Sequence, residues 1–264
     1  MTDVPEVSEV SELSDGTGVS DRAGAPGGPA RLVVISGGVS DPSSTRMLAD
    51  RIAAKSAELL RGAGTGVSVR VIELGPLAVD IAHATTGGFL NQRLRDAVTL
   101  LGEADAVIAA TPVYKAGLSG LFKSFADLLD NDLLVAKPVV LAATAGSPRH
   151  SLVIDDQMRA LFGYLRALSL PTSVFASPDE WASPELGRRV ERAAVELAAA
   201  VRSGIAREIT GQAWGHYQHE YGGNAAQPGH GTGDIDLSTD LMRLAAGGGL
   251  PPSAAPSPTP SATG

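Results

Sequence analysis

Residues 36–46, SGGVSDPSSTR, combine glycines with hydroxyl side chains directly after a short apolar run. The glycines let the backbone approach a ligand closely, while Ser43, Ser44 and Thr45 place hydroxyl and N–H groups where a helical pattern begins. Unpaired N–H donors and the helix dipole favour an anion there, with Ser36 at the near end of the loop. We therefore predict a phosphate-binding loop, with a long helix-capping loop as the alternative. The loop lacks Gly-Lys-Ser/Thr, which excludes a nucleoside-triphosphate loop.

A second candidate loop, residues 111–116, follows an apolar run and precedes a helical pattern. Because Pro112 has no N–H, we expect the strand to end there, so that the loop lies where open α/β sheets bind ligands. Pro112 and Val113 would supply a small apolar face, and the N–H groups that follow would reach the oxygens of a flat ring. Tyr114 and Lys115 would shape one wall. The alternative is an ordinary strand-to-helix turn with a surface lysine.

A third turn of small residues, 144–150 (TAGSPRH), follows another apolar run. In a parallel sheet it would share an edge with the first two loops and place Thr144, Ala145 and Gly146 opposite the second. Together the three loops would form a tray for a flat ring that carries a phosphate. FMN fits that description.

The elements that must position these loops alternate regularly along the chain. Five apolar runs read as strands: 31–36, 67–74, 105–110, 138–144 and 171–177. Each is followed by a helical pattern, and this alternation predicts an α/β fold with a doubly wound parallel sheet and right-handed crossovers. Five strands suit the flavodoxin-like order 2-1-3-4-5, in which the ligand binds between the first and third strands.

The ends of the chain differ in composition from its middle. Residues 1–30 are rich in Ser, Gly, Pro and acids, and residues 211–264 end in PPSAAPSPTPSATG. We predict a disordered acidic N-terminal tail, one domain over residues 31–210, and a mostly disordered C-terminal extension with a short helix near 236–246. The run 215–220, GHYQHE, is a weak metal signal, so we expect no metal and read it as a tail segment that packs on a neighbour.

Composition excludes several classes of function. The net charge is −8, and residues 1–30 hold six acids against one arginine, which leaves −3 for the remainder. Because phosphate backbones require a basic field, nucleic acid is not an expected partner. The chain has no cysteine, so thiol catalysis and thiolate metal sites are excluded. With neither a secretory signal pattern nor a long apolar run, we expect no membrane association and a cytoplasmic location.

The stretch 111–130, TPVYKAGLSGLFKSFADLLD, resembles the flavin-site segment of the NAD(P)H-dependent FMN reductases that serve two-component flavin monooxygenases of the alkanesulfonate type. The segment that begins LAATAGSPRH is similar to that family's next strand, loop and helix, with Ala145 in place of a glycine and with Gly146, His150 and Asp155 matching. The serine loop corresponds to the family's phosphate loop. The resemblance covers about residues 31–206.

The resemblance implies a flavodoxin-like homodimer or homotetramer that reduces FMN with NAD(P)H and passes reduced flavin to a partner monooxygenase or electrons to another acceptor. The residues implied as cofactor-binding are Ser36, Ser43, Ser44, Thr45, Pro112, Val113, Tyr114, Lys115, Thr144, Ala145 and Gly146. No side chain is implied as a catalytic acid or base, because hydride passes directly between the nicotinamide and flavin rings. His150 could contact flavin or nicotinamide, or be a buried, hydrogen-bonded histidine.

Two positions depart from the family pattern. The family often has an arginine inside the phosphate loop, whereas here Arg46 lies on the following helix. The sulfonate-system reductase has a tyrosine where this chain has Leu118, so a tightly held FMN is an alternative to a released one. A flavin-dependent quinone or azo reductase therefore remains open. So does a non-enzymatic flavodoxin-type carrier, although only Tyr114 offers an aromatic ring in these loops.

Overall fold

The computed structural model describes residues 28–213. The strands are β1 (Ala30–Ser36), β2 (Val67–Glu73), β3 (Ala106–Tyr114), β4 (Gly117–Leu118), β5 (Pro138–Thr144), β6 (Leu168–Ser169) and β7 (Val174–Ala176). The helices are α1 (Ser44–Gly62), α2 (Ala78–Gly87), α3 (Gln92–Gly102), α4 (Gly120–Ala126), α5 (Arg159–Tyr164), α6 (Pro184–Ser203) and α7 (Ile205–Ala213). Single 3-10 turns span Gly75–Leu77, Pro148–His150 and Pro178–Glu180, and a π-helical turn, Ile154–Met158, leads into α5.

The sheet has the order β2-β1-β3-β5-β6, with parallel pairing throughout this path. β7 also pairs with β5 in parallel, beyond β6, so β6 and β7 together occupy the fifth position. This arrangement confirms the predicted flavodoxin-like order 2-1-3-4-5. The expected fifth strand, 171–177, is only the β7 half, and Pro171, which cannot donate to a ladder, lies between the two halves.

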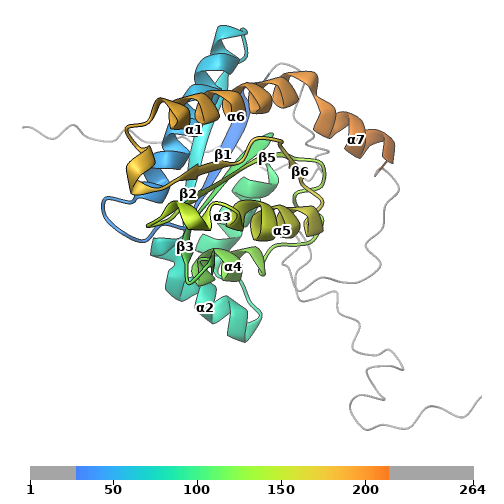
Figure 1. Cartoon of the computed structure of the whole chain (residues 1–264). Helices are drawn as coiled ribbons and strands as arrows, with labels where there is room; N and C mark the ends of the chain where they lie inside the picture. Colours follow the sequence, from blue (N-terminus) through green and yellow to red (C-terminus); the bar gives the residue numbers. More distant parts are fainter. Residues whose placement is uncertain (1–27, 214–264) are drawn as a thin grey trace, which may run out of the picture.

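Helices cover both faces of the sheet (Figure 1). Alternate strand residues enter two separate cores. In β3, Val107 belongs to the core beneath α2, α3, α4 and α5, where Phe122 is one of the largest side chains. Its neighbour Ile108 belongs to the core beneath α1 and α6, together with Leu48 and Leu197. Burial on both faces explains the unbroken apolar runs from which the strands were predicted.

One predicted boundary is wrong: β3 does not end at Pro112 but continues to Tyr114. β1 pairs with β3 only as far as Ser36 opposite Ala110, whereas β5 continues to pair until Thr144 lies opposite Pro112. Backbone groups of successive strand residues point to alternate sides, and the Ala110 carbonyl accepts from Gly37 on the β1 side. The N–H that Pro112 lacks would therefore point beyond the end of β1, where no ladder bond is lost.

The segment after β3 is a hairpin that the sequence did not predict. β4 turns back antiparallel to β3, pairing Leu118 with Val113 and Gly117 with Tyr114. The two turn residues, Lys115 and Ala116, have φ values of 50° and 62°. Positive φ at both positions is the geometry of a two-residue hairpin turn, which normally carries Asn or Gly. The expected helix therefore begins only at Gly120, with the Ser119 hydroxyl as its N-cap.

Replacing Ala116 by glycine is expected to stabilise the protein. An L-residue in the left-handed region costs about 1–2 kcal/mol, and the greater freedom of glycine in the unfolded chain returns part of that. We expect Ala116→Gly to raise the free energy of unfolding by about 0.5–1 kcal/mol in urea titrations. The control, Ala82→Gly on the exposed face of α2, should lower it by about 1 kcal/mol. Equal destabilisation by both changes would contradict a strained turn.

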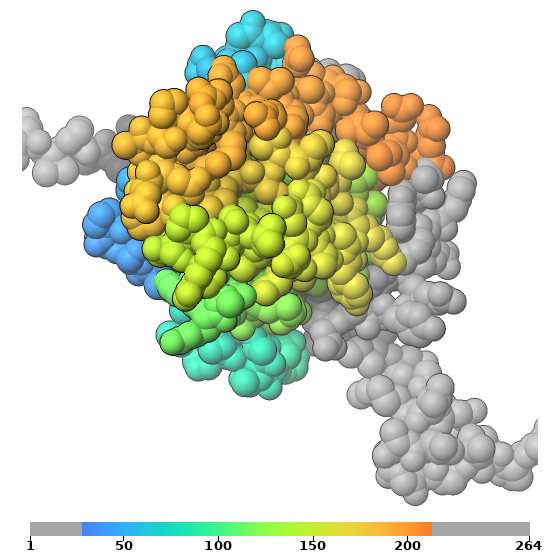
Figure 2. All heavy atoms as spheres, viewed as in Figure 1, coloured from blue at the N-terminus to red at the C-terminus, as the bar shows by residue number. Residues whose placement is uncertain are grey.

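Helix α2 was also missed, because its Ala- and Thr-rich sequence buries only Ile81 and Ala84. The Gly62–Gly66 run ends α1, with Gly64 at φ 82°. In the space-filling view α7 extends from one corner of the domain (Figure 2). No helix within residues 28–213 is both long and apolar enough to cross a membrane. The predicted tails up to residue 27 and from 214, the helix near 236–246 and the run 215–220 lie outside the described residues.

Candidate functional site

The three predicted loops meet at the carboxyl edge of the sheet. β1, β3 and β5 are adjacent, and they deliver Ser36, Pro112 and Thr144 to neighbouring positions at their ends. The first loop then enters α1, the second forms the β3–β4 hairpin, and the third enters the turn Pro148–His150. The sheet order therefore brings together the residues that the sequence placed in separate segments.

The first loop is folded closely around the start of α1. Ser43 is the N-cap, and its hydroxyl accepts a hydrogen bond of 3.2 Å from the Arg46 N–H. A Cβ on Gly38 would overlap the Ser43 hydroxyl, so the loop requires glycine at this point. Within the described chain, the N–H groups of Ser44 and Thr45 have no hydrogen-bond acceptor. These two donors at the positive end of a 19-residue helix form a fitting cradle for a phosphate.

The Thr45 side chain is directed away from that cradle. Its hydroxyl lies 2.7 Å from the Thr144 hydroxyl, and the two side chains are buried at 2% and 5% exposure. Thr45 can therefore offer a phosphate its backbone N–H, while its hydroxyl ties the first loop to the third. Nothing in the sequence indicated this bond between residues 99 positions apart.

Arg46 likewise faces away from the loop. Its guanidinium forms an ion pair with Asp50 at 2.8 Å and another with Glu73 at the end of β2. The hydrogen bond that Arg46 donates to Asp50 is the largest cause that raises the pKa of Arg46. With two carboxylates around it, Arg46 serves to join α1 to β2, and the loop relies on N–H and hydroxyl donors for an anion.

The second loop presents a different surface from the one predicted. Val113 is only 8% exposed and packs in the core, and Pro112 is buried as well. Tyr114, at 53% exposure, and Lys115 project from the hairpin and are free to form a wall. The Thr111 hydroxyl accepts from the Ser119 N–H at 3.2 Å and so closes the base of the hairpin.

Gln157 is a further residue at this edge that the sequence did not single out. Its side-chain amide hydrogen-bonds to the backbone of Ala116 and Leu118. The carboxamide gave no signal because it comes from a helix 39 residues further along the chain.

The third loop leaves space for a ligand. The Ala145 N–H donates to the Ala176 carbonyl at 3.2 Å, which fixes the start of the loop beside β7. A Cβ on Gly146 would meet nothing within 4 Å, so this exposed glycine leaves room for a ligand. His150 is half-buried, and its imidazole has no hydrogen-bond partner among residues 28–213. This finding disfavours the alternative of a buried, hydrogen-bonded histidine.

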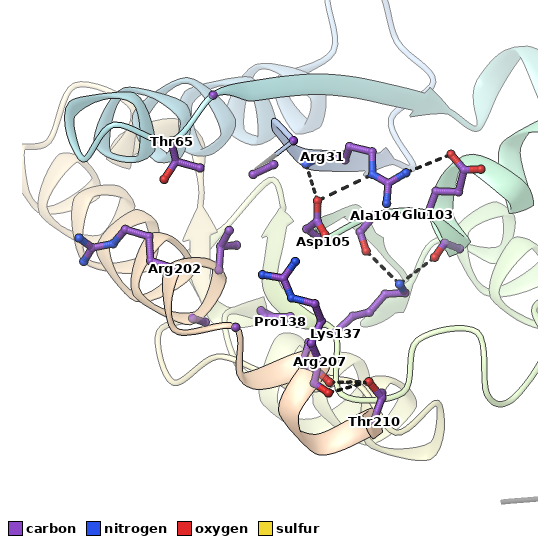
Figure 3. A pocket seen from close by; sticks show the side chains of 18 of the residues that line it. Arg31, Thr65, Glu103, Ala104, Asp105, Lys137, Pro138, Arg202, Arg207 and Thr210 are labelled. Atoms are coloured by element: carbon purple, nitrogen blue, oxygen red, sulfur yellow. Dashed lines mark hydrogen bonds and ion pairs between the residues drawn. The ribbon is translucent and has the colours of Figure 1, made fainter. Parts of the chain in front are cut away.

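A cavity of about 530 Å³ lies at the opposite, amino edge of the sheet, where Ala30 and Pro138 begin β1 and β5 (Figure 3). In it Arg31 lies between Asp105 and Glu103, and the Lys137 ammonium donates to the Gly102 and Ala104 carbonyls at 2.8 and 2.9 Å. Burial is the main cause that lowers the pKa of Lys137. These groups hold the end of α3 against the sheet, a full strand length away from the three loops.

Comparisons with known proteins show the family of this chain. Residues 30–182 match the family described as NADPH-dependent FMN reductase. The NADH-dependent FMN reductase SfnE of Pseudomonas putida is 40% identical over 171 residues, 65% of this chain and 89% of that protein. The FMN reductase (NADPH) of Pseudomonas aeruginosa is 33% identical, again over 65% of this chain and 89% of the relative.

Among solved structures, an oxidoreductase from Corynebacterium diphtheriae aligns with a TM-score of 0.65 and 42% identity, covering 66% of this chain and 98% of that one. The matched segment contains all three loops and every predicted cofactor residue. The resemblance drawn from the sequence is thereby confirmed, and the chain belongs to the NADPH-dependent FMN reductase family.

Proposed function

We propose that this protein is an NAD(P)H-dependent FMN reductase that binds FMN at the carboxyl edge of β1, β3 and β5. The observation that carries the proposal is the pair of unpaired N–H donors at Ser44 and Thr45, beside Gly38, within the described residues. These donors lie at the carboxyl ends of β1 and β3, where the strand order reverses, in a chain that belongs to this family. The phosphate of FMN would accept from these donors and from the hydroxyls of Ser43, Ser44 and Ser36.

The ring of FMN would lie between the second and third loops. Tyr114 and Lys115 would border it on the hairpin side. Pro112 and Val113 are buried and would support that part of the backbone from behind. Thr144, Ala145 and Gly146 would border it on the other side, and His150 is free to contact flavin or nicotinamide. Bound FMN accepts a hydride from the dihydronicotinamide, and the protein contributes orientation and exclusion of water.

We also propose that a second copy of the chain and a flavin-dependent monooxygenase are its partners. Large apolar side chains are exposed on the described surface, among them Phe89 at 74%, Leu152 at 66% and Tyr164 at 68%. In a homodimer or homotetramer, the form that the resemblance to the family implies, such side chains could pack between copies. The naming of two relatives for NADH and NADPH supports either nicotinamide as donor. We place the reaction in the cytoplasm, where these donors are generated.

The direct test is steady-state oxidation of NADH and of NADPH by the full-length protein, with and without added FMN. We expect FMN to stimulate oxidation of at least one donor, with saturation in both substrates. Stimulation that requires free FMN at each turnover would indicate a released flavin, whereas full activity of protein purified with FMN would indicate a held one. If neither donor is oxidised under any of these conditions, the reductase assignment is wrong.

A further inference from the structure

We propose that Gln157 is a positioning residue of the flavin site, which holds the β3–β4 hairpin in the shape that borders the ring. Its Oε1 accepts from the Leu118 N–H at 3.1 Å, and its Nε2 donates to the Ala116 carbonyl at 3.2 Å. One carboxamide thus satisfies an acceptor in the turn and a donor on β4. This inference rests on the proposed function, because the hairpin matters for FMN only if the ring lies beside it.

The hairpin needs such support because its own geometry is weak. β4 has only two residues, and its single partner strand is β3. The turn that joins them places two non-glycine residues, Lys115 and Ala116, at positive φ. Short hairpins with an unfavourable turn are marginal in water unless something pairs with their free edge. The Gln157 amide occupies that edge as the backbone of a neighbouring strand would.

The π-helical turn explains how Gln157 reaches the hairpin. The Arg159 N–H bonds to the Ile154 carbonyl five residues earlier, which widens the helix at this turn. Ile154 and Met158 are buried at 1% and 0% exposure and anchor the turn in the core, so Gln157 is held on the side of β4. A Cβ on Gly117 would lie 3.3 Å from the Gln157 Oε1, which shows how closely the amide and the strand approach.

The shape of the hairpin decides the position of the residues that would border the flavin. Tyr114 and Lys115 belong to the hairpin, so their position depends on whether the turn keeps its shape. Gln157 itself lies at the surface, where its two hydrogen bonds compete with water. We therefore expect a moderate effect on FMN, of about tenfold in affinity, which is the size expected for two neutral hydrogen bonds.

The test compares Gln157→Leu, Gln157→Glu and the control Gln92→Leu, which removes a surface glutamine of α3 that bonds to Asp96. FMN affinity would be measured from the quenching of flavin fluorescence, and KM for FMN and kcat from NAD(P)H oxidation. We expect Gln157→Leu to weaken FMN binding about tenfold and to raise KM for FMN more than it lowers kcat, while Gln92→Leu matches the wild type.

The Gln157→Glu variant adds the pH dependence of FMN affinity, which would not change if Gln157 affected only the overall stability of the protein. At pH 7.5 the introduced carboxylate would face the Ala116 carbonyl and weaken binding, because two acceptors repel. At pH 5 part of the carboxyl population is protonated and can donate to that carbonyl as the amide does. We therefore expect FMN affinity, relative to wild type at the same pH, to recover on acidification in Gln157→Glu but not in Gln157→Leu.

A failure of the role proposed for Gln157 can be distinguished from a failure of the proposed function. If the wild type binds FMN and Gln157→Leu binds it equally well at an unchanged melting temperature, the role of Gln157 is wrong and the proposed function stands. If the wild type neither binds FMN nor oxidises NAD(P)H in its presence, the proposed function is wrong, and the role of Gln157 at a flavin site falls with it.

Discussion

Ser43→Asp is expected to abolish FMN binding while the protein stays folded. The new carboxylate would lie beside the N–H cradle of Ser44 and Thr45, where the phosphate would bind. Two unit charges about 4 Å apart near a protein surface repel by about 4 kcal/mol, so affinity should fall at least about 100-fold. FMN titration followed by flavin fluorescence measures the loss. Aspartate is a good N-cap, so α1 should form as before.

The matched control is Ser183→Asp. Ser183 is the N-cap of α6, and its hydroxyl accepts from the Glu185 N–H at 3.1 Å, so the same exchange is made at another helix N-cap. Ser183 does not adjoin the N–H groups of Ser44 and Thr45, so FMN affinity should fall far less than in Ser43→Asp. A Ser43→Asp protein that still binds FMN like wild type would place the phosphate elsewhere. Equal losses in both variants would point to a general effect of charge.

The buried pair Thr45 and Thr144 should show strong coupling in a double-mutant cycle. Thr45→Val or Thr144→Val alone leaves the other hydroxyl buried without a partner, which costs about 1–3 kcal/mol. Replacing both removes the two polar groups together, so the double variant should be nearly as stable as wild type. We expect a coupling energy of about 1–2 kcal/mol from urea denaturation of the four proteins.

The same four proteins test whether this bond supports the site. Because it joins the first loop to the third, each single variant should also bind FMN more weakly than wild type. Thr85→Val is a suitable control, since the Thr85 hydroxyl bonds to the Ile81 carbonyl within α2 and joins none of the three loops. Its effect on stability should stay within about 0.5 kcal/mol. Additive losses in the double variant would show that the two hydroxyls are not coupled.

Local sequence patterns predicted secondary structure correctly where they reflect burial. The apolar runs of β1 and β5 are buried on both faces, so their composition alone located them within one residue. The alternation of strands and helices then gave the sheet order. The end of β3 was predicted wrongly at Pro112, because the cost of a missing N–H depends on where the neighbouring strand β1 ends. Helix α2 was not predicted, because its small side chains leave little apolar periodicity.

The sequence by itself determined the fold class and the edge at which the three loops meet, and it predicted the first loop to be an anion site. These features follow from periodicity, from glycine and proline, and from hydroxyl residues at a helix start. Only the tertiary structure showed that the Thr45 hydroxyl bonds to Thr144, that carboxylates hold Arg46, and that Gln157 braces the hairpin. Such contacts join residues from separate segments, and their existence depends on side-chain direction and packing, which no local pattern encodes.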